Sequence, residues 1–174
     1  MDELNYIIAT ATARMTEPYF LLPIYGGNPV NRERVYCYEL YHLMRCEWPS
    51  GARYVLNGEV DKRAHVAMQA LGVGNEKPDF LVHNPGVMED NHAIIEVKVI
   101  GAAVRDIRKD LATLTLFRQG PQYDRAIYLF YGNGDRDRLI RRIQKAAATV
   151  PGSDGIEVWH HMQLGASADR IAVL

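Results

Sequence analysis

The stretch KPDFLVHNPGVMEDNHAIIEVKV, residues 77–99, contains two apolar runs that are joined by a turn. The runs at 79–84 and 93–99 predict two β-strands, and Asn-Pro-Gly predicts the start of their connection. The second run carries Glu96 and Lys98 among apolar residues. Because side chains alternate along a strand, these two residues share one face. A charge on a covered face is costly unless it is paired or binds a metal.

The rest of the chain predicts an α/β protein. The strand at 125–133 is apolar throughout, which is typical of a strand buried on both faces. Residues 16–31 are too rich in Pro and Gly for a long element. An antiparallel meander followed by alternating helices and strands predicts a mixed central β-sheet flanked by helices. The remaining expected elements are helices at 2–15, 32–47 (buried around most of its circumference), 104–119 and 136–150, and strands at 52–60 and 156–161.

Composition indicates an ordinary globular domain. The 174 residues are 48% hydrophobic and 24% charged, and the formal net charge of −1 does not indicate a nucleic-acid binder. The first residues lack the basic start of a signal peptide, and no apolar run is long enough for a bilayer, so we expect a cytoplasmic protein. Cys37 and Cys46 would lie roughly 13 Å apart along one helix. That separation is too long for a disulfide, so we expect reduced thiols.

The charges on the strand at 93–99 have two interpretations. Glu96 and Lys98 could form an ordinary ion pair on a solvent-facing side of the sheet. Alternatively, antiparallel pairing of the two runs sets Asp79 beside Glu96, with Lys98 close by. A register shifted by one residue would put Asp79 on the other face, and the sequence leaves the register open.

The second interpretation predicts hydrolytic chemistry. Two carboxylates a few ångströms apart repel each other unless a cation lies between them, and such oxygen ligands suit Mg²⁺ or Mn²⁺. A metal there would hold a phosphate oxygen and polarise a water. Lys98 could orient that water, accept its proton if its pKa is depressed, or stabilise the charged transition state. The pattern therefore indicates hydrolysis of a phosphodiester.

Pro78-Asp79 followed by Glu96-Val97-Lys98 in an apolar strand resembles the signature of the PD-(D/E)XK nuclease superfamily. That superfamily includes restriction endonucleases, Holliday junction resolvases, and recombination and repair nucleases. The resemblance implies that Asp79 and Glu96 are metal ligands, that the carbonyl of Val97 is a further ligand, and that Lys98 is the catalytic lysine.

The order of the elements is also similar to the αβββαβ core of that superfamily. The core would span about residues 32–133, with a further helix and strand at 134–161. We therefore expect a restriction endonuclease-like domain at 32–174 and an N-terminal extension at 1–31.

Further carboxylates have open roles. Many members of the superfamily add a Glu from the first core helix, and Glu39 fits that place. The alternative is a solvent-facing Glu39, or one paired with Arg32 or His42. Glu59 and Asp61 either extend the acidic cluster or belong to a turn with ordinary surface charges.

The expected partner is nucleic acid, DNA rather than RNA, and endonuclease activity is favoured over exonuclease activity. Arg105, Arg108 and Lys109 follow the catalytic strand and are candidates for phosphate contacts, although a solvated helix face is the default interpretation. A small chain with one site predicts a homodimer, through the apolar residues 18–25, or a subunit of a larger complex, without a membrane. The alternative function is a non-catalytic nucleic-acid-binding or assembly protein with the nuclease fold.

Overall fold

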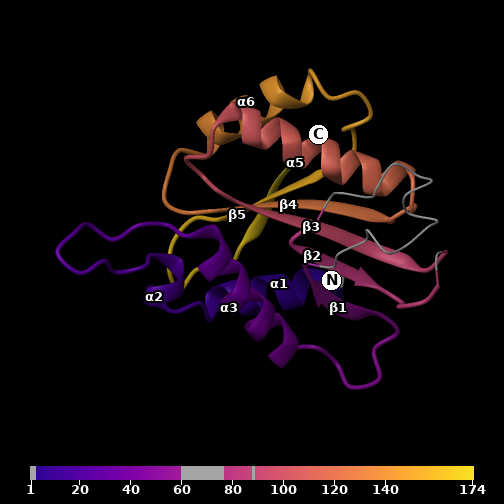
Figure 1. The fold of residues 1–174 in the computed structure, drawn as a ribbon, viewed down its shortest axis with the longest axis horizontal. Coiled ribbons are helices and arrows are strands. Elements are labelled where there is room, and N and C mark those ends of the chain that lie inside the picture. Colours follow the sequence, from indigo (N-terminus) through magenta and orange to yellow (C-terminus); the bar gives the residue numbers. More distant parts are fainter. Residues whose placement is uncertain (1–2, 60–76, 88) are drawn as a thin grey trace.

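A six-stranded mixed sheet forms the centre of the computed structural model, which describes residues 3–59, 77–87 and 89–174 (Figure 1). Each strand lies beside its neighbours in sequence. The first three strands pair antiparallel, the third to fifth pair parallel, and the sixth is antiparallel to the fifth. The strands are β1 (Val55–Gly58), β2 (Phe80–His83), β3 (Asn91–Val99), β4 (Arg125–Tyr131), β5 (Glu157–His161) and β6 (Asp169–Val173). The predicted α/β class with a mixed sheet is confirmed.

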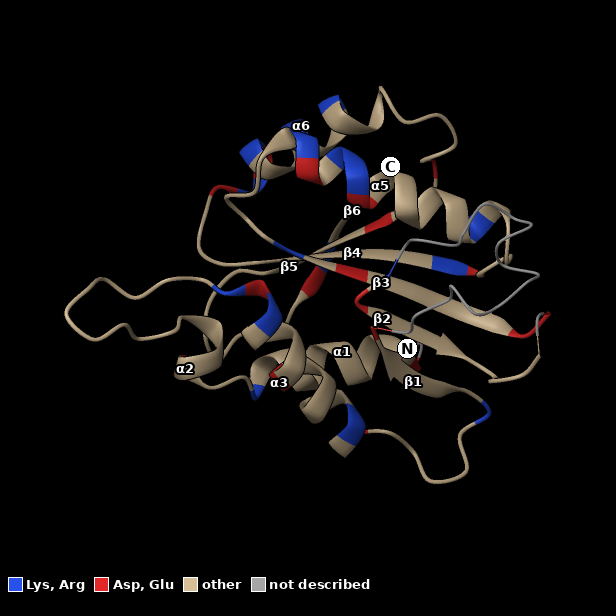
Figure 2. Cartoon of the chain, viewed as in Figure 1, with Lys and Arg blue, Asp and Glu red and all other residues tan. Residues whose placement is uncertain are grey.

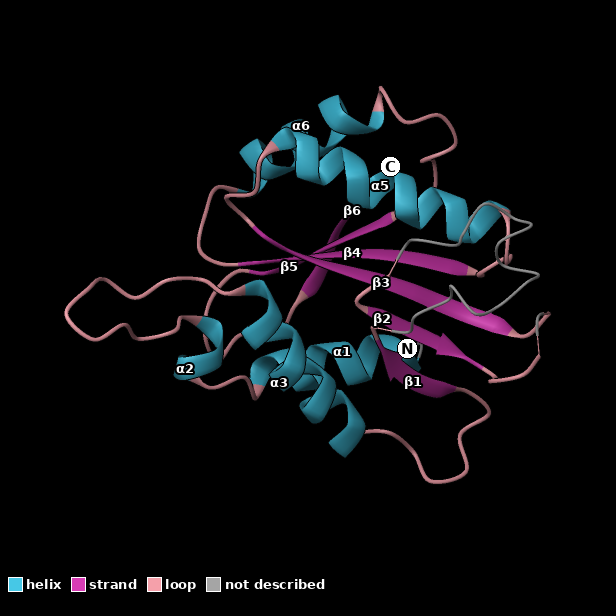
Figure 3. Cartoon of the chain, in the orientation of Figure 1, coloured by secondary structure: helices cyan, strands magenta, loops and turns pink. Residues whose placement is uncertain are grey.

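Helices cover both faces of the sheet (Figure 3). They are α1 (Glu3–Ala13), α2 (Glu17–Phe20), α3 (Glu33–Cys46), α5 (Val104–Gln119) and α6 (Arg136–Ala147). The first three lie on one face, and α5 and α6 lie on the other. The helices α5 and α6 each connect two parallel strands, as expected for crossovers in such a sheet.

Alternation along β3 decides which face its charges take. Ile95 and Val97 belong to the apolar cluster beneath α1 and α3, whereas Ile94 belongs to the cluster beneath α5 and α6. Glu96 and Lys98 are in phase with Ile94, so they lie on the α5 side of the sheet. Both faces of β3 are therefore covered, which is the setting in which a charge needs a partner.

The N-terminal residues contribute to the core. Leu4, Ile7 and Ile8 of α1 are buried in the same cluster as the apolar side of α3. Residues 21–31 form a loop that projects from the body in Figure 1, closed by a bridge between Leu22 and Val30. The segment predicted as an extension thus packs on the sheet before it enters that loop.

Several elements differ from the sequence-based expectation. The short helix α2 lies within the segment expected to be irregular, and the strand β6 was not predicted. The expected strand at 52–60 is four residues long in the described part of the chain. Helix α3 buries one stripe and exposes Tyr38, so it is not buried around most of its circumference.

Neither cysteine forms a disulfide: Cys37 is buried and Cys46 is exposed, both as free thiols on α3. Within the described ranges, every helix is too short or too polar to cross a membrane.

Candidate functional site

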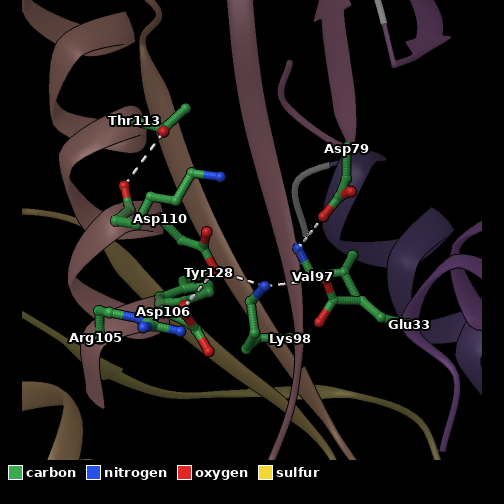
Figure 4. A network of polar contacts seen from close by, with 10 residues as sticks. Glu33, Asp79, Val97, Lys98, Arg105, Asp106, Asp110, Thr113 and Tyr128 are labelled. Atoms are coloured by element: carbon green, nitrogen blue, oxygen red, sulfur yellow. Dashed lines mark hydrogen bonds and ion pairs between the residues drawn. The ribbon is translucent and has the colours of Figure 1, made fainter. Parts of the chain in front are cut away.

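The pairing of β2 with β3 decides whether the predicted site forms. Phe80 lies opposite Ile95, and this register places Asp79 beside Glu96. The Oδ2 atom of Asp79 accepts a hydrogen bond of 2.7 Å from the backbone N–H of Val97 (Figure 4). The register that the sequence left open is therefore the one that brings the two carboxylates together, on the same face as Lys98.

Lys98 has two carboxylate partners that the sequence analysis did not identify. Its Nζ atom lies 3.0 Å from Oε1 of Glu33 and 2.9 Å from Oδ2 of Asp110 (Figure 4). Asp110 also accepts a hydrogen bond of 2.9 Å from the hydroxyl of Tyr128. Glu33 begins α3 and Asp110 lies on the buried side of α5, so Lys98 connects helices from the two layers.

These partners fix the protonation state of Lys98. Burial alone would lower the pKa of the ammonium group, but the charges and hydrogen bonds of Asp110 and Glu33 raise it above its ordinary value. A lysine acts as a base only when its pKa is depressed. In this arrangement Lys98 keeps its proton, and its suitable role is electrostatic.

For Asp79 and Glu96, in contrast, the surroundings disfavour the charged form of the side chain. Burial raises the pKa of Asp79 to about 6, against the effect of the Val97 N–H, which favours the ionised form. Burial, followed by the charge of Asp79, raises the pKa of Glu96 well above its ordinary value. Two buried carboxylates that repel each other favour either a proton or a bound cation.

A polar cavity of about 550 Å³ joins these groups. The four carboxylates described above and Lys98 line it, and so does Glu59. Figure 2 shows acidic positions of β3 and of the start of α3 close together near the centre, whereas basic positions of α6 lie in the outer helix layer. The cavity thus combines a dense group of carboxylates with one buried ammonium.

Among the other predicted carboxylates, Glu59 lines the cavity and lies 3.5 Å from the Nε atom of Arg34. Glu39 is half-buried on α3 and does not belong to the lining. Glu33, six residues earlier on the same helix, provides the helix carboxylate of the cavity. Asp61 lies outside the described residues.

The three basic residues predicted on α5 divide into two groups. Lys109 lines the cavity. Arg105 and Arg108 are exposed and do not line it, and Arg105 pairs with the neighbouring Asp106. Arg34 and Lys77, which sequence reasoning did not single out, supply the other cations of the lining. Positive charge therefore surrounds the acidic centre from α3, α5 and the approach to β2.

The donor set suits a hard divalent cation, although it is not assembled as a metal cage. Within the described residues, no three His, Cys, Asp or Glu side chains are arranged to hold a metal ion. Asp79 and Glu96 nevertheless offer carboxylate oxygens, the preferred ligands of Mg²⁺ and Mn²⁺. Extending the β2–β3 register would place Pro78 opposite Val97, and a proline has no N–H to donate to the Val97 carbonyl. That carbonyl is a further oxygen donor at the same place.

No protein-family model, curated protein or solved structure matches this chain. The functional assignment must therefore be argued from the residues of the chain and their geometry.

The two carboxylates that sequence reasoning missed do leave a signal in the sequence. Asp110 lies three residues after Ile107 and four before Leu114, so it occupies the apolar stripe of α5. Glu33 lies three residues before Tyr36 and seven before Leu40, which places it on the buried side of α3. A carboxylate in phase with the buried side of a helix indicates a buried partner.

Proposed function

We propose that the protein is a metal-dependent nuclease of the PD-(D/E)XK type that hydrolyses phosphodiester bonds, with DNA as the preferred substrate and cleavage within the strand. The observation that carries the proposal is the meeting of Asp79 and Glu96 beside Val97, with Lys98 on the same face of the sheet. Two of the motif residues lie on β3 and the third, Asp79, directly precedes β2, and the proposed chemistry requires that they converge.

In this proposal Asp79, Glu96 and the Val97 carbonyl hold Mg²⁺ or Mn²⁺. The chemistry that the bound cation supplies is polarisation of the phosphodiester and activation of the attacking water. A cation bound there would favour the ionised forms of Asp79 and Glu96, whose pKa values burial raises in its absence. The Lys98 ammonium stabilises the negative charge that develops on the phosphate.

Cations around the cavity bring the substrate to this centre. Arg34, Lys77 and Lys109 line the same cavity as the carboxylates. Phosphate contacts of this kind contribute affinity that does not depend on sequence and that falls as salt rises. The formal net charge of −1 does not oppose this role. The nucleic-acid strand interacts with the charges that line the cavity and not with the net charge of the protein.

One observation favours the alternative of a non-catalytic nucleic-acid-binding or assembly protein with this fold. Lys98 is engaged by both Glu33 and Asp110, and a satisfied buried network of this kind also serves to fix a fold. The alternative predicts nucleic-acid binding without cleavage.

A cleavage assay separates the two functions. The purified protein is incubated with plasmid, four-way junction, single-stranded DNA and RNA in Mg²⁺, Mn²⁺ or EDTA. We expect cleavage that depends on the metal, that is lost in Asp79→Ala and Lys98→Ala, and that persists in Glu39→Gln, since Glu39 does not line the cavity. Binding of the same nucleic acids without cleavage in either metal would favour the alternative.

A further inference from the structure

A second, more apolar pocket adjoins the acidic cavity. It has a volume of about 330 Å³, and its walls include Tyr38, Tyr41 and Phe80. Asp79 and Glu59 line both this pocket and the acidic cavity. The two cavities therefore share a wall at Asp79, the proposed metal ligand, so the aromatic pocket lies next to the carboxylates.

The aromatic rings of this pocket differ in how they are held. Tyr41 is half-buried and near-parallel to Phe80, with ring centroids 6.2 Å apart and an interplanar angle of 18°. Its hydroxyl donates a hydrogen bond of 3.3 Å to the carbonyl of Leu56, which fixes the ring. Tyr38 is 61% exposed, although it is a large aromatic residue in the middle of a helix that packs on the core. The pocket thus has a fixed aromatic wall and an exposed aromatic ring at its edge.

Helix α3 connects the charged cavity to the aromatic pocket. Residues 34, 38 and 41 are spaced by four and three positions, so they follow one side of the helix. Arg34 lines the acidic cavity, whereas Tyr38 and Tyr41 line the adjoining pocket. A ligand that lies along this side of α3 contacts the guanidinium of Arg34 and then the rings of Tyr38 and Tyr41. In a nucleotide, the phosphate and the base are arranged in the same order.

We propose that the aromatic pocket binds an unpaired base of the nucleic-acid strand whose neighbouring phosphate lies at Asp79 and Glu96. The inference rests on the proposed nuclease function and narrows its substrate to strands with an unpaired nucleotide at the cut, such as single strands, flaps, gaps and loops. Aromatic side chains bind bases by stacking, largely without regard to sequence. A base inside a duplex is already stacked and paired, so it would have to leave the helix to enter the pocket.

Cleavage of an oligonucleotide with single abasic substitutions tests this inference. On an unpaired strand, an abasic site next to the cut should lower the parent rate by about 10-fold or more, the range expected for one lost base–aromatic stack. Tyr38→Ala should lower the rate on the intact strand by a similar factor, and the abasic site should then add little, because the two changes remove the same contact. Tyr38→Phe retains the ring and should cleave like the parent. Tyr6→Ala is the matched control, since Tyr6 is 55% exposed on α1 and lies outside both pockets.

The possible results separate this inference from the nuclease function. Three results would overturn the base pocket and leave the nuclease function in place. They are cleavage rates that do not depend on the position of the abasic site, a parent-like rate for Tyr38→Ala, and equally fast cleavage of intact duplex. Should no substrate be cleaved, the nuclease function fails, and binding of a single strand carrying 2-aminopurine decides the pocket. Fluorescence quenching by the parent that is lost in Tyr38→Ala supports base binding, and an absence of quenching by the parent overturns it.

Discussion

The carboxylate of Asp79 accepts a hydrogen bond of 2.7 Å from the backbone N–H of Val97, the residue between Glu96 and Lys98. This contact connects the residue before β2 to the C-terminal part of β3, just beyond the last pair of the antiparallel ladder. The β2–β3 register, extended by one pair, places Asp79 opposite Glu96 on the same face. The hydrogen bond therefore holds two repelling carboxylates together, and the cost of that arrangement can be measured.

Asp79→Asn should stabilise the metal-free protein above neutral pH. The pKa of Asp79 is raised to about 6 in the folded state, mainly by burial, so the folded protein holds a proton that the unfolded chain releases from about pH 4. The penalty is absent at pH 4 and complete above about pH 6. We expect the free energy of unfolding to rise by about 1–3 kcal/mol at pH 8, and by little at pH 4. Urea denaturation in EDTA at both pH values measures the difference.

The substitution should act oppositely when metal is present, because the variant loses a ligand. Mn²⁺ should raise the unfolding midpoint of the parent and leave that of Asp79→Asn nearly unchanged. Glu89→Gln, at an exposed carboxylate in the loop before β3, is the control and should follow the parent in both conditions. An equal response of Asp79→Asn and the parent to Mn²⁺ contradicts the assignment of Asp79 as a ligand.

Lys98→Met should destabilise the fold. The side chain of Lys98 is 14% exposed and its ammonium pairs with Asp110 and Glu33, and removing one partner of a largely buried pair leaves uncompensated charge. We expect a loss of about 2–4 kcal/mol, less than for a fully buried pair because Glu33 is partly exposed. The double variant with Asp110→Asn should recover part of this loss, since the amide keeps the hydrogen bond from Tyr128 without the charge. Simple addition of the two single effects in urea denaturation would show that the pair is not coupled.

His161 should make the fold sensitive to acid. This residue is fully buried at the end of β5, with Nδ1 2.9 Å from the hydroxyl of Tyr36. Burial lowers the pKa of His161 to about 4, whereas the unfolded chain takes up this proton near pH 6.5. The free energy of unfolding should therefore fall as pH decreases from about 6.5 to 4, by about 2–3 kcal/mol from this residue.

The contribution of His161 is measured as a difference between pH profiles, because the raised pKa of Asp79 acts in the opposite direction. His161→Gln should be less stable at neutral pH but should lose this dependence between pH 6.5 and 4. His42→Gln, at an exposed position on α3, should leave the profile unchanged. Parallel profiles for His161→Gln and the parent would assign the acid sensitivity to other groups.

The sequence predicted the shared face of Glu96 and Lys98 because that follows from strand geometry alone. It could not predict the register with β2. Apart from Glu96 and Lys98, the paired parts of both runs are apolar on each face, as Leu81 and Ile94 on one side and Phe80 and Ile95 on the other illustrate. A shift of one residue therefore exchanges apolar residues for apolar residues, and hydrophobicity does not choose between the two registers. The tertiary contacts of both layers make that choice.

Other parts of the structure were missed for different reasons. Glu39 was selected because it fits the place of a glutamate on the first core helix of the superfamily, and Glu33 was not considered. The phase of the helix decides which carboxylate faces the sheet. The strand β6 is short and mostly exposed at the edge of the sheet, so its sequence carries little apolar alternation. The strand conformation of β6 is stabilised by its antiparallel pairing with β5, which the sequence of β6 alone does not indicate.

Lys98→Arg distinguishes an electrostatic role of Lys98 from a role as a base. The carboxylates of Asp110 and Glu33 raise the pKa of Lys98 despite its burial, so the residue stays protonated between pH 6 and 9. An arginine keeps the charge over the same range, and we expect Lys98→Arg to retain about a tenth of the parent cleavage rate, the loss coming from the different shape of the guanidinium. Lys98→Gln removes the charge and should reduce the rate by about 10²–10³-fold.

The dependence of the rate on pH should have the same form in Lys98→Arg and in the parent, because in neither protein does residue 98 titrate in this range. A base would behave differently: Lys98→Arg would be as inactive as Lys98→Gln, and the parent rate would rise through a lysine pKa that both variants lack. Single-turnover cleavage rates of the three proteins at saturating Mn²⁺, measured from pH 6 to 9, decide between the two roles.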